Sequence, residues 1–245
     1  MANPKIPTRE SPLTPSGEGR SLWRQTLEAG AALLQDMTPL KDFDVYVAGL
    51  HCAHHEPEMQ MEAHHFCRQV NQDFLQCVIF DGNTKDANLI GIEYIISERL
   101  FATLPEDEKA LWHPHNYEIL SGQLVAPGLP EVAERAFLEQ LMNSYGKTWH
   151  TWHTGRHEQP GDGHPLPFGD AKLMWSFNRD GEANEALKQD FQSGLGFSEL
   201  DKREKRSALV ERAHPQQGVD AMHGEFSGAT QPLPGVVEAE GSGGG

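Results

Sequence analysis

The residues of this sequence that could do chemistry are its histidines, which gather in a few short runs. The stretch HCAHHEPEMQMEAHHFC at 51–67 holds five histidines and two cysteines. Most of the thirteen histidines lie in four groups: His51, His54 and His55; His64 and His65; His113 and His115; and His150, His153 and His157. Because imidazole is the commonest metal-binding side chain in proteins, these groups predict a metal site if the fold brings them together.

Local geometry limits how many of these histidines one ion could bind. The segment EAHHFC at 62–67 is typical of a strand, whose neighbouring residues point to opposite faces, so only one of His64 and His65 can bind a given ion. In His-Pro-His the proline favours an extended backbone, which places His113 and His115 on one side. Glu118 follows closely enough to add an oxygen ligand.

The spacing of His150 and His153 would suit one face of a helix, but their Thr- and Trp-rich surroundings favour a strand and opposite sides. One of the two is expected to be a ligand. Glu93 lies within the apolar run LIGIEYII, where its charge requires a partner, either Arg68, Arg99 or a histidine. The candidate metal ligands are therefore His51, His64, His65, Glu93, His113, His115, Glu118 and His150.

A structural interpretation of the histidines stands beside this one, because single histidines are often hydrogen-bonded in a core or exposed at the surface.

The cysteines predict no chemistry of their own. Cys52, Cys67 and Cys77 are odd in number and form no C-x-x-C, which disfavours a disulfide framework and favours a reducing cytoplasm. Cys67 and Cys77 are expected to be inert core thiols, since their neighbours are apolar.

Composition and motifs exclude several classes of function. A net charge of −16 opposes the phosphate neutralisation on which nucleic-acid binding depends, so no nucleic-acid partner is expected. The longest apolar runs are far shorter than the roughly 20 residues that span a bilayer. The sequence contains no G-x-G-x-x-G, G-x-S-x-G or H-E-x-x-H, so the common nucleotide, hydrolase and zinc-protease signatures are missing.

The elements that must position the histidines belong to one predicted domain of the α+β class, a mainly antiparallel sheet flanked by helices. Strands are expected within 43–50, 62–70, 74–81 and 87–97, because these segments are rich in β-branched and aromatic residues, and another is expected at 117–125. The domain covers residues 21–205. Residues 1–20 and 206–245 have few large apolar residues, which predicts a flexible arm and a flexible low-complexity tail.

Several blocks of the sequence resemble the oil body-associated protein family, a domain of unknown function. The blocks cover approximately residues 25–200 and are EAGAALLQ at 28–35, GLHC at 49–52, EAHHFC at 62–67, LIGIEYIISERLF at 89–101, LWHPHNYEILSG at 111–122 and YGKTWHTW at 145–152. The resemblance implies no catalytic residues. It places six of the histidines in recognisable blocks, which favours them as members of a shared pocket: His51, His64, His65, His113, His115 and His150.

Two functions remain open at this stage. The resemblance favours a soluble, non-catalytic protein that binds a lipid surface, a protein partner or a second copy of itself. The histidines favour a metal-dependent enzyme or sensor that binds zinc or iron, because mixed His and Glu ligands suit those ions.

Overall fold

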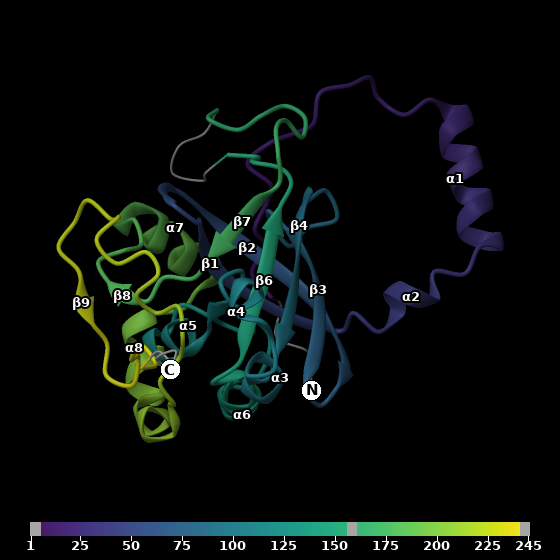
Figure 1. Ribbon diagram of the computed structural model, residues 1–245. Coiled ribbons are helices and arrows are strands. Elements are labelled where there is room, and N and C mark those ends of the chain that lie inside the picture. The colour runs from purple at the N-terminus through teal and green to yellow at the C-terminus, as the bar shows by residue number, and fades with distance from the viewer. Residues whose placement is uncertain (1–5, 156–160, 241–245) are drawn as a thin grey trace.

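The computed structural model describes residues 6–155 and 161–240. Its central feature is an antiparallel sheet that closes on itself (Figure 1). Around the ring the strands follow the order β4-β3-β2-β1-β7-β6, and β6 pairs again with β4. The strands of the ring are β1 (Val45–Ala53), β2 (Glu56–Asn71), β3 (Phe74–Phe80), β4 (Leu89–Ile96), β6 (Tyr145–His150) and β7 (Lys172–Trp175).

The pairing of β4 with β6 is what closes the sheet. It runs without a register shift from Gly91 opposite His150 to Ile96 opposite Tyr145. A short strand, β5 (His113–Pro114), pairs with the other end of β6, where His113 lies opposite Gly146. The predicted domain with an antiparallel sheet flanked by helices is confirmed, and the structure adds the closure, which leaves one face of the six strands pointing inward.

Helices lie beside and at one end of the closed sheet (Figure 1). None of those in the described part of the chain is long and apolar enough to cross a bilayer. The helices are α1 (Leu22–Leu34), α2 (Thr38–Lys41), α3 (Glu98–Phe101), α4 (Glu106–Lys109), α5 (Asn116–Ser121), α6 (Glu131–Leu141), α7 (Glu185–Leu195), α8 (Glu199–Lys205) and the 3₁₀ helix η1 (Ser207–Arg212). A second small sheet pairs β8 (Arg179–Asp180) with β9 (Gln231–Pro232).

The strand expected at 117–125 is wrong over most of its length. Residues Asn116–Ser121 form α5, and Gly122 ends the helix in the left-handed conformation, with φ of 93°. Every residue of α5 is buried, so its sequence carries no polar face from which a helical period could be recognised. Only Val125 joins the sheet, through a bridge to Ala48.

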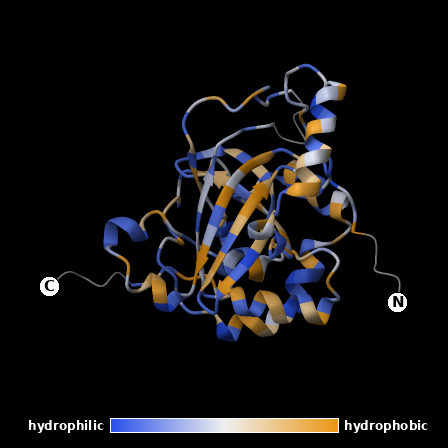
Figure 2. Ribbon diagram, turned by 90° about the vertical axis from the view of Figure 1, so that its right-hand side faces the viewer, coloured by the Kyte–Doolittle hydropathy of each residue, from blue (hydrophilic) through white to orange (hydrophobic). Residues whose placement is uncertain are grey.

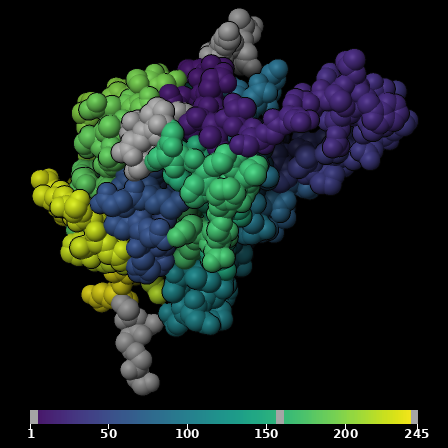
Figure 3. All heavy atoms as spheres, turned by 90° about the horizontal axis from the view of Figure 1, so that it is seen from above, coloured from purple at the N-terminus to yellow at the C-terminus, as the bar shows by residue number. Residues whose placement is uncertain are grey.

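Residues of the expected flexible N-terminal arm contact the folded body. Arg9 binds the sheet, because its guanidinium donates to Glu62 at 2.8 Å and to Asp190 of α7 at 2.5 Å. Ser11 donates to Asp81 at 2.7 Å. By contrast α1, predicted as part of the domain, has no buried residue and projects from the body (Figure 3). Residues 1–5 lie outside the described part of the chain.

Residues 206–240, expected to belong to a flexible tail, contribute side chains to the folded core. Its scattered apolar residues lie in the main hydrophobic core: Leu209, Val219, Met222, Leu233 and Val236. Backbone pairing supports them, since Gln216 N–H donates to the Val237 carbonyl. A low density of apolar residues suggested that this segment could not offset its ordering entropy, but each of these side chains reaches a core built by other elements. Residues 241–245 lie outside the described part.

Cys67 and Cys77 form a disulfide, which corrects the prediction of two core thiols. The register between β2 and β3 places the two residues directly opposite each other, with 4.0 Å between their Cα atoms. Sequence alone could not show this, because the register follows from the whole strand pair. Cys52 stays a buried free thiol.

We expect the Arg9–Glu62 contact to determine part of the acid stability. Burial alone would raise the pKa of Glu62, but hydrogen bonds from His64 and Arg9 outweigh it and hold the pKa at about 2, against 4.5 for a free glutamate. The folded state therefore binds this proton more weakly than the unfolded state, and the stabilisation present above pH 4.5 is lost as the pH falls toward 2. Glu62→Gln should cost about 3 kcal/mol at pH 7, and the difference from the wild type should shrink toward pH 2.

Urea unfolding between pH 7 and 2 measures this difference. Glu28→Gln, on the exposed helix α1, is the control and should leave the pH dependence unchanged. A constant difference between Glu62→Gln and wild type across the whole range would contradict the prediction.

Candidate metal centre

Most of the predicted ligands meet inside the closed sheet. His65 on β2 reaches Glu93 on β4 although β3 lies between the two strands, and His51 on β1 approaches His150 on β6 although β7 lies between them. The side chains of both pairs are buried within the ring. His113 and His115 enter from β5 and the start of α5, and Glu118 from the first turn of α5.

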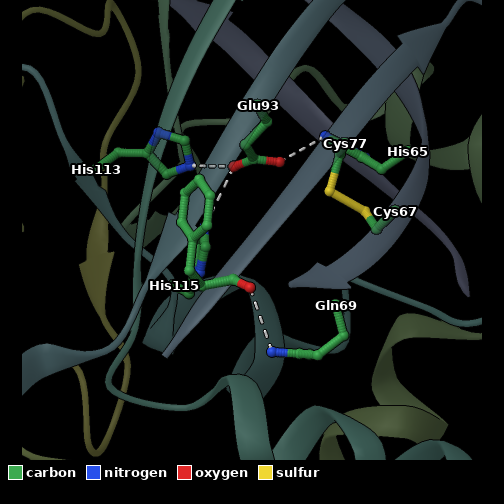
Figure 4. Close-up of a disulfide and its surroundings, with 8 residues drawn as sticks. His65, Cys67, Gln69, Cys77, Glu93, His113 and His115 are labelled. Atoms are coloured by element: carbon green, nitrogen blue, oxygen red, sulfur yellow. Dashed lines mark hydrogen bonds and ion pairs between the residues drawn. A yellow bond between two sulfur atoms is a disulfide. The ribbon is translucent and has the colours of Figure 1, made fainter. Parts of the chain in front are cut away.

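Glu93 is the centre of this cluster, and Figure 4 shows three imidazoles directed at its carboxylate. One oxygen, Oε2, lies 3.0 Å from Nε2 of His65. The other, Oε1, lies 3.4 Å from Nε2 of His113 and 3.5 Å from Nε2 of His115. Of the partners considered for Glu93 from the sequence, the structure shows histidines and not Arg68 or Arg99, which instead pair with Asp42 and Asp73.

The remaining members lie around this carboxylate. Three sets of donor atoms come within 4.8 Å of one another and could each hold an ion: Glu93, His113 and His115; His51, His65 and Glu93; and His51, His113 and Glu118. His150 is in none of these sets. Its Nε2 lies 3.4 Å from Nδ1 of His51, and its Nδ1 lies 3.0 Å from the sulfur of Met61. His150 therefore holds the ring of His51 in position.

Two other histidines lie away from the cluster. His64 points to the opposite face of β2 from His65, as strand alternation predicts, and its ring lies between Tyr46, at 2.7 Å, and Glu62, at 2.8 Å. His153 lies beyond the end of β6, with its Nε2 3.8 Å from Asp162. His157 lies outside the described residues.

Burial controls the charges of the cluster. It lowers the pKa of His113, lowers that of His51 well below its ordinary value and lowers that of His150 to about 3, so these rings are neutral at pH 7. For Glu93 burial opposes ionisation, but the surrounding histidines outweigh it and hold the pKa well below 4.5. Burial and the Glu93 charge raise the pKa of Glu118 well above its ordinary value. The cluster thus combines the Glu93 carboxylate with neutral imidazoles at His51, His113 and His150, and a neutral imidazole is the form that binds a metal.

The donor atoms converge on a small space beside Gly146 of β6. A Cβ atom at Gly146 would lie 2.2 Å from Oε1 of Glu93, 2.6 Å from Nε2 of His115 and 2.7 Å from Nε2 of His113. A side chain at this position would therefore displace these three groups. A separate cavity of about 20 Å³ lies against His51, His65, Glu93, His115 and Glu118 and is closed on its other side by Val47, Ile95, Leu124 and Leu141. This cavity has room for about one water molecule.

The hydrogen bonds of the imidazoles leave their Nε2 atoms available. Nδ1 of His115 bonds to the hydroxyl of Ser144 at 2.8 Å, which fixes the ring with Nε2 toward Glu93. Neither ring nitrogen of His65 or His113 has a well-aligned hydrogen-bond partner among the described residues, although both side chains are buried. Buried polar atoms without such partners are costly, and a bound ion would satisfy them.

The distances also suit coordination. Around an ion bound at about 2.1 Å, neighbouring ligand atoms lie about 3.0 to 3.4 Å apart. The separations of 3.4 and 3.5 Å from Glu93 Oε1 to the two histidines are close to this range. The arrangement can hold a divalent ion with little movement of the side chains.

Some members of the site could not be chosen from the sequence. Gly146 and Ser144 carry no ligand atoms and their importance follows only from their position next to the imidazoles. The only indication of their importance in the sequence is that Gly146 lies within the YGKTWHTW block and Ser144 directly precedes it.

Comparisons with known proteins agree on one family. A family model described as "Protein of unknown function (DUF1264)" matches residues 37–210. The chain is 37% identical over 210 residues to oil body-associated protein 1A of Zea mays, covering 86% of this chain and 83% of the relative. It is 34% identical over 212 residues to oil body-associated protein 1B of Arabidopsis thaliana, covering 86% and 84% of the two chains.

A further relative matches over a shorter region. Oil body-associated protein 2A of Arabidopsis thaliana is 40% identical over 162 residues, which cover 66% of this chain and 63% of the relative. No solved structure matches the chain.

The two buried glutamates should respond differently to removal of their charge in chelator-treated protein. Glu118→Gln should change the free energy of unfolding at pH 7 by less than about 1 kcal/mol, because Gln resembles the protonated carboxyl that burial favours at this position. Glu93→Gln should cost about 3 kcal/mol, because it removes the carboxylate to which three imidazoles are directed. Denaturant unfolding measures both values, and equal costs for the two variants would contradict the assignment of charge.

Proposed function

The chain belongs to the DUF1264 family, which its oil body-associated relatives represent, and we propose that it is a metal-binding protein that holds a divalent ion between Glu93, His113 and His115. The observation that carries this proposal is the convergence of three donor atoms on the space next to Gly146. The three ligands come from three elements that the chain brings together only on folding, namely β4, β5 and the start of α5.

The donor set favours zinc or iron. Two imidazoles and one carboxylate are a common ligand set for both ions, whereas an all-oxygen set would favour magnesium or calcium. An ion bound there acts as a Lewis acid. The protein residues hold the ion in place: Ser144 fixes the ring of His115, and the apolar residues around the cavity exclude bulk water.

Metal titration of chelator-treated protein tests the proposal with a substitution that adds one methyl group. Gly146→Ala should weaken zinc binding at least 100-fold, because the new Cβ would occupy the space between the three donor atoms. His113→Ala/His115→Ala should abolish binding at this site. Gly49→Ala is the matched control: Gly49 is also a strand glycine, on β1, but its Cβ would meet only the end of Leu124, at 3.2 Å.

Calorimetry gives the affinities, and circular dichroism verifies that each variant is folded. Unchanged zinc affinity in folded Gly146→Ala and His113→Ala/His115→Ala would reduce the cluster to a hydrogen-bonded core.

A second candidate function is association with a lipid surface through α1, and one observation favours it. Hydrophobic and hydrophilic residues alternate along this helix (Figure 2), and its large apolar side chains are at least half exposed: Leu22, Trp23, Leu27, Leu33 and Leu34. At 100° per residue these side chains share one half of the helix, and Arg24, Gln25 and Glu28 lie on the other. An amphipathic helix of this kind can lie in the interface of a lipid layer.

The charges of α1 suggest which lipid surface it would suit. Arg24 and Glu28 cancel, and the whole chain carries a net charge of −16, so attraction to anionic lipids gives no advantage. Binding would depend on burial of the apolar face, as on a neutral phospholipid layer over oil. The names of the relatives agree with this proposal, because they describe proteins associated with oil bodies.

Flotation with triacylglycerol droplets coated in phosphatidylcholine tests this function. Trp23→Ser/Leu27→Ser/Leu34→Ser should reduce the bound fraction at least tenfold, whereas Gln25→Ser/Ala29→Ser/Ala32→Ser, on the other side of the helix, should leave it unchanged. Binding should persist in 0.5 M salt, since no charge attraction is involved. Equal flotation of both variants would exclude α1, and concentration-dependent self-association without flotation would indicate that a second copy covers this face.

A further inference from the structure

The two oxygens of the Glu93 carboxylate face different groups of histidines. Oε1 faces His113 and His115, which together with Gly146 surround the proposed ion. Oε2 faces His65, at 3.0 Å, from the other side of the carboxylate (Figure 4). The ring of His51 lies next to that of His65, with 5.0 Å between their centroids, and His51, His65 and Glu93 form one of the sets of converging donor atoms.

A distinct space accompanies this second set. The cavity of about 20 Å³ contacts His51, His65 and Glu93, but neither His113 nor Gly146 lines it. The first set converges instead on the space next to Gly146. Glu118 lines the cavity as well and could contribute a carboxylate oxygen. His115 of the first set borders this cavity as well, so the two sets of donor atoms adjoin at the Glu93 carboxylate. They reach different oxygens of it, since His65 faces Oε2 and His113 and His115 face Oε1.

From this arrangement we propose that the site is dinuclear, with a second divalent ion held by His51, His65 and Oε2 of Glu93, so that the Glu93 carboxylate bridges the two ions. The inference rests on the proposed metal-binding function and extends it. Bridging by a carboxylate is compatible with the separation of about 3.5 to 4 Å that two-metal centres adopt.

Neighbouring residues orient the ligands of the second set. His51 is oriented by His150, whose Nε2 lies 3.4 Å from Nδ1 of His51, and His150 is held in turn by the sulfur of Met61. Both ring nitrogens of His65 are buried without a well-aligned hydrogen bond among the described residues. Nε2 lies 3.0 Å from Oε2 of Glu93, so one ion could bind both atoms. A residue that contacts the second ring nitrogen of a ligand histidine, as His150 contacts His51, commonly fixes the orientation of that ligand.

The charge of the site makes the two ions unequal. Two divalent ions bring four positive charges, whereas the cluster has only two carboxyl groups among the described residues, Glu93 and Glu118, which cannot balance them. The second ion therefore enters a site that already carries the charge of the first and binds more weakly. Titration should show two classes of affinity. A mononuclear site in which both oxygens of Glu93 bind the same ion would show a single class.

The stoichiometry of zinc bound to untagged, chelator-treated protein distinguishes these arrangements. We expect two ions per chain in the wild type and one in His51→Ala/His65→Ala. The matched control, His54→Ala/His55→Ala, removes two neighbouring histidines of the turn between β1 and β2 that lie outside the cluster, and it should still bind two ions. Equilibrium dialysis followed by elemental mass spectrometry gives the counts.

Each result has a definite meaning. One ion in the wild type overturns the dinuclear inference and leaves the proposed function intact, whereas no ion overturns both. Two ions in folded His51→Ala/His65→Ala overturn the placement of the second ion. If that variant does not fold, electron paramagnetic resonance of the wild type loaded with two equivalents of Mn²⁺ decides: a magnetically coupled pair supports the bridge, and isolated Mn²⁺ signals overturn it.

Discussion

The carboxylate of Glu93 is buried inside a closed sheet, where water cannot solvate its charge, and the protein supplies its partners from separate elements. His65, His113 and His115 approach the two oxygens from β2, β5 and the start of α5. A buried charge without such partners would cost several kcal/mol, so the carboxylate and the imidazoles constrain one another and the strands that carry them. The arrangement of β4, β5 and α5 follows from this constraint.

The closed sheet determines what this polar interior can do. Closure through β4 and β6 leaves an inward face to which every strand contributes, and its side chains hold their positions because both edges of each strand in the ring are paired. The disulfide between Cys67 and Cys77 joins β2 to β3 in the cross-strand row that also carries Glu93, two residues along β2 from His65. Rigid placement suits a metal centre, whose ligands must remain within a few tenths of an ångström of their coordinating positions. The apolar residues around the cavity restrict what can enter.

Sequence reasoning reached the class of the fold and most members of the cluster, for reasons visible at particular residues. Strand alternation separated His64 from His65, and Pro114 indicated the extended geometry of His113. His115 instead has helical backbone angles at the start of α5. The apolar setting of Glu93 showed that it needed a partner. Local patterns could not show closure of the sheet, because the pairing of β4 with β6 joins segments about fifty residues apart. For the same reason the register that creates the Cys67–Cys77 disulfide and the space beside Gly146 became visible only in three dimensions.

Anomalous diffraction from crystals of untagged protein, purified without chelator or added metal, would test the metal centre most directly. Data collected above and below the zinc and iron absorption edges identify both the element and its position. The account predicts an anomalous peak about 2.0 to 2.3 Å from Oε1 of Glu93 and from Nε2 of His113 and His115. The absence of a peak inside the closed sheet, with the histidines hydrogen-bonded directly to Glu93, would contradict it.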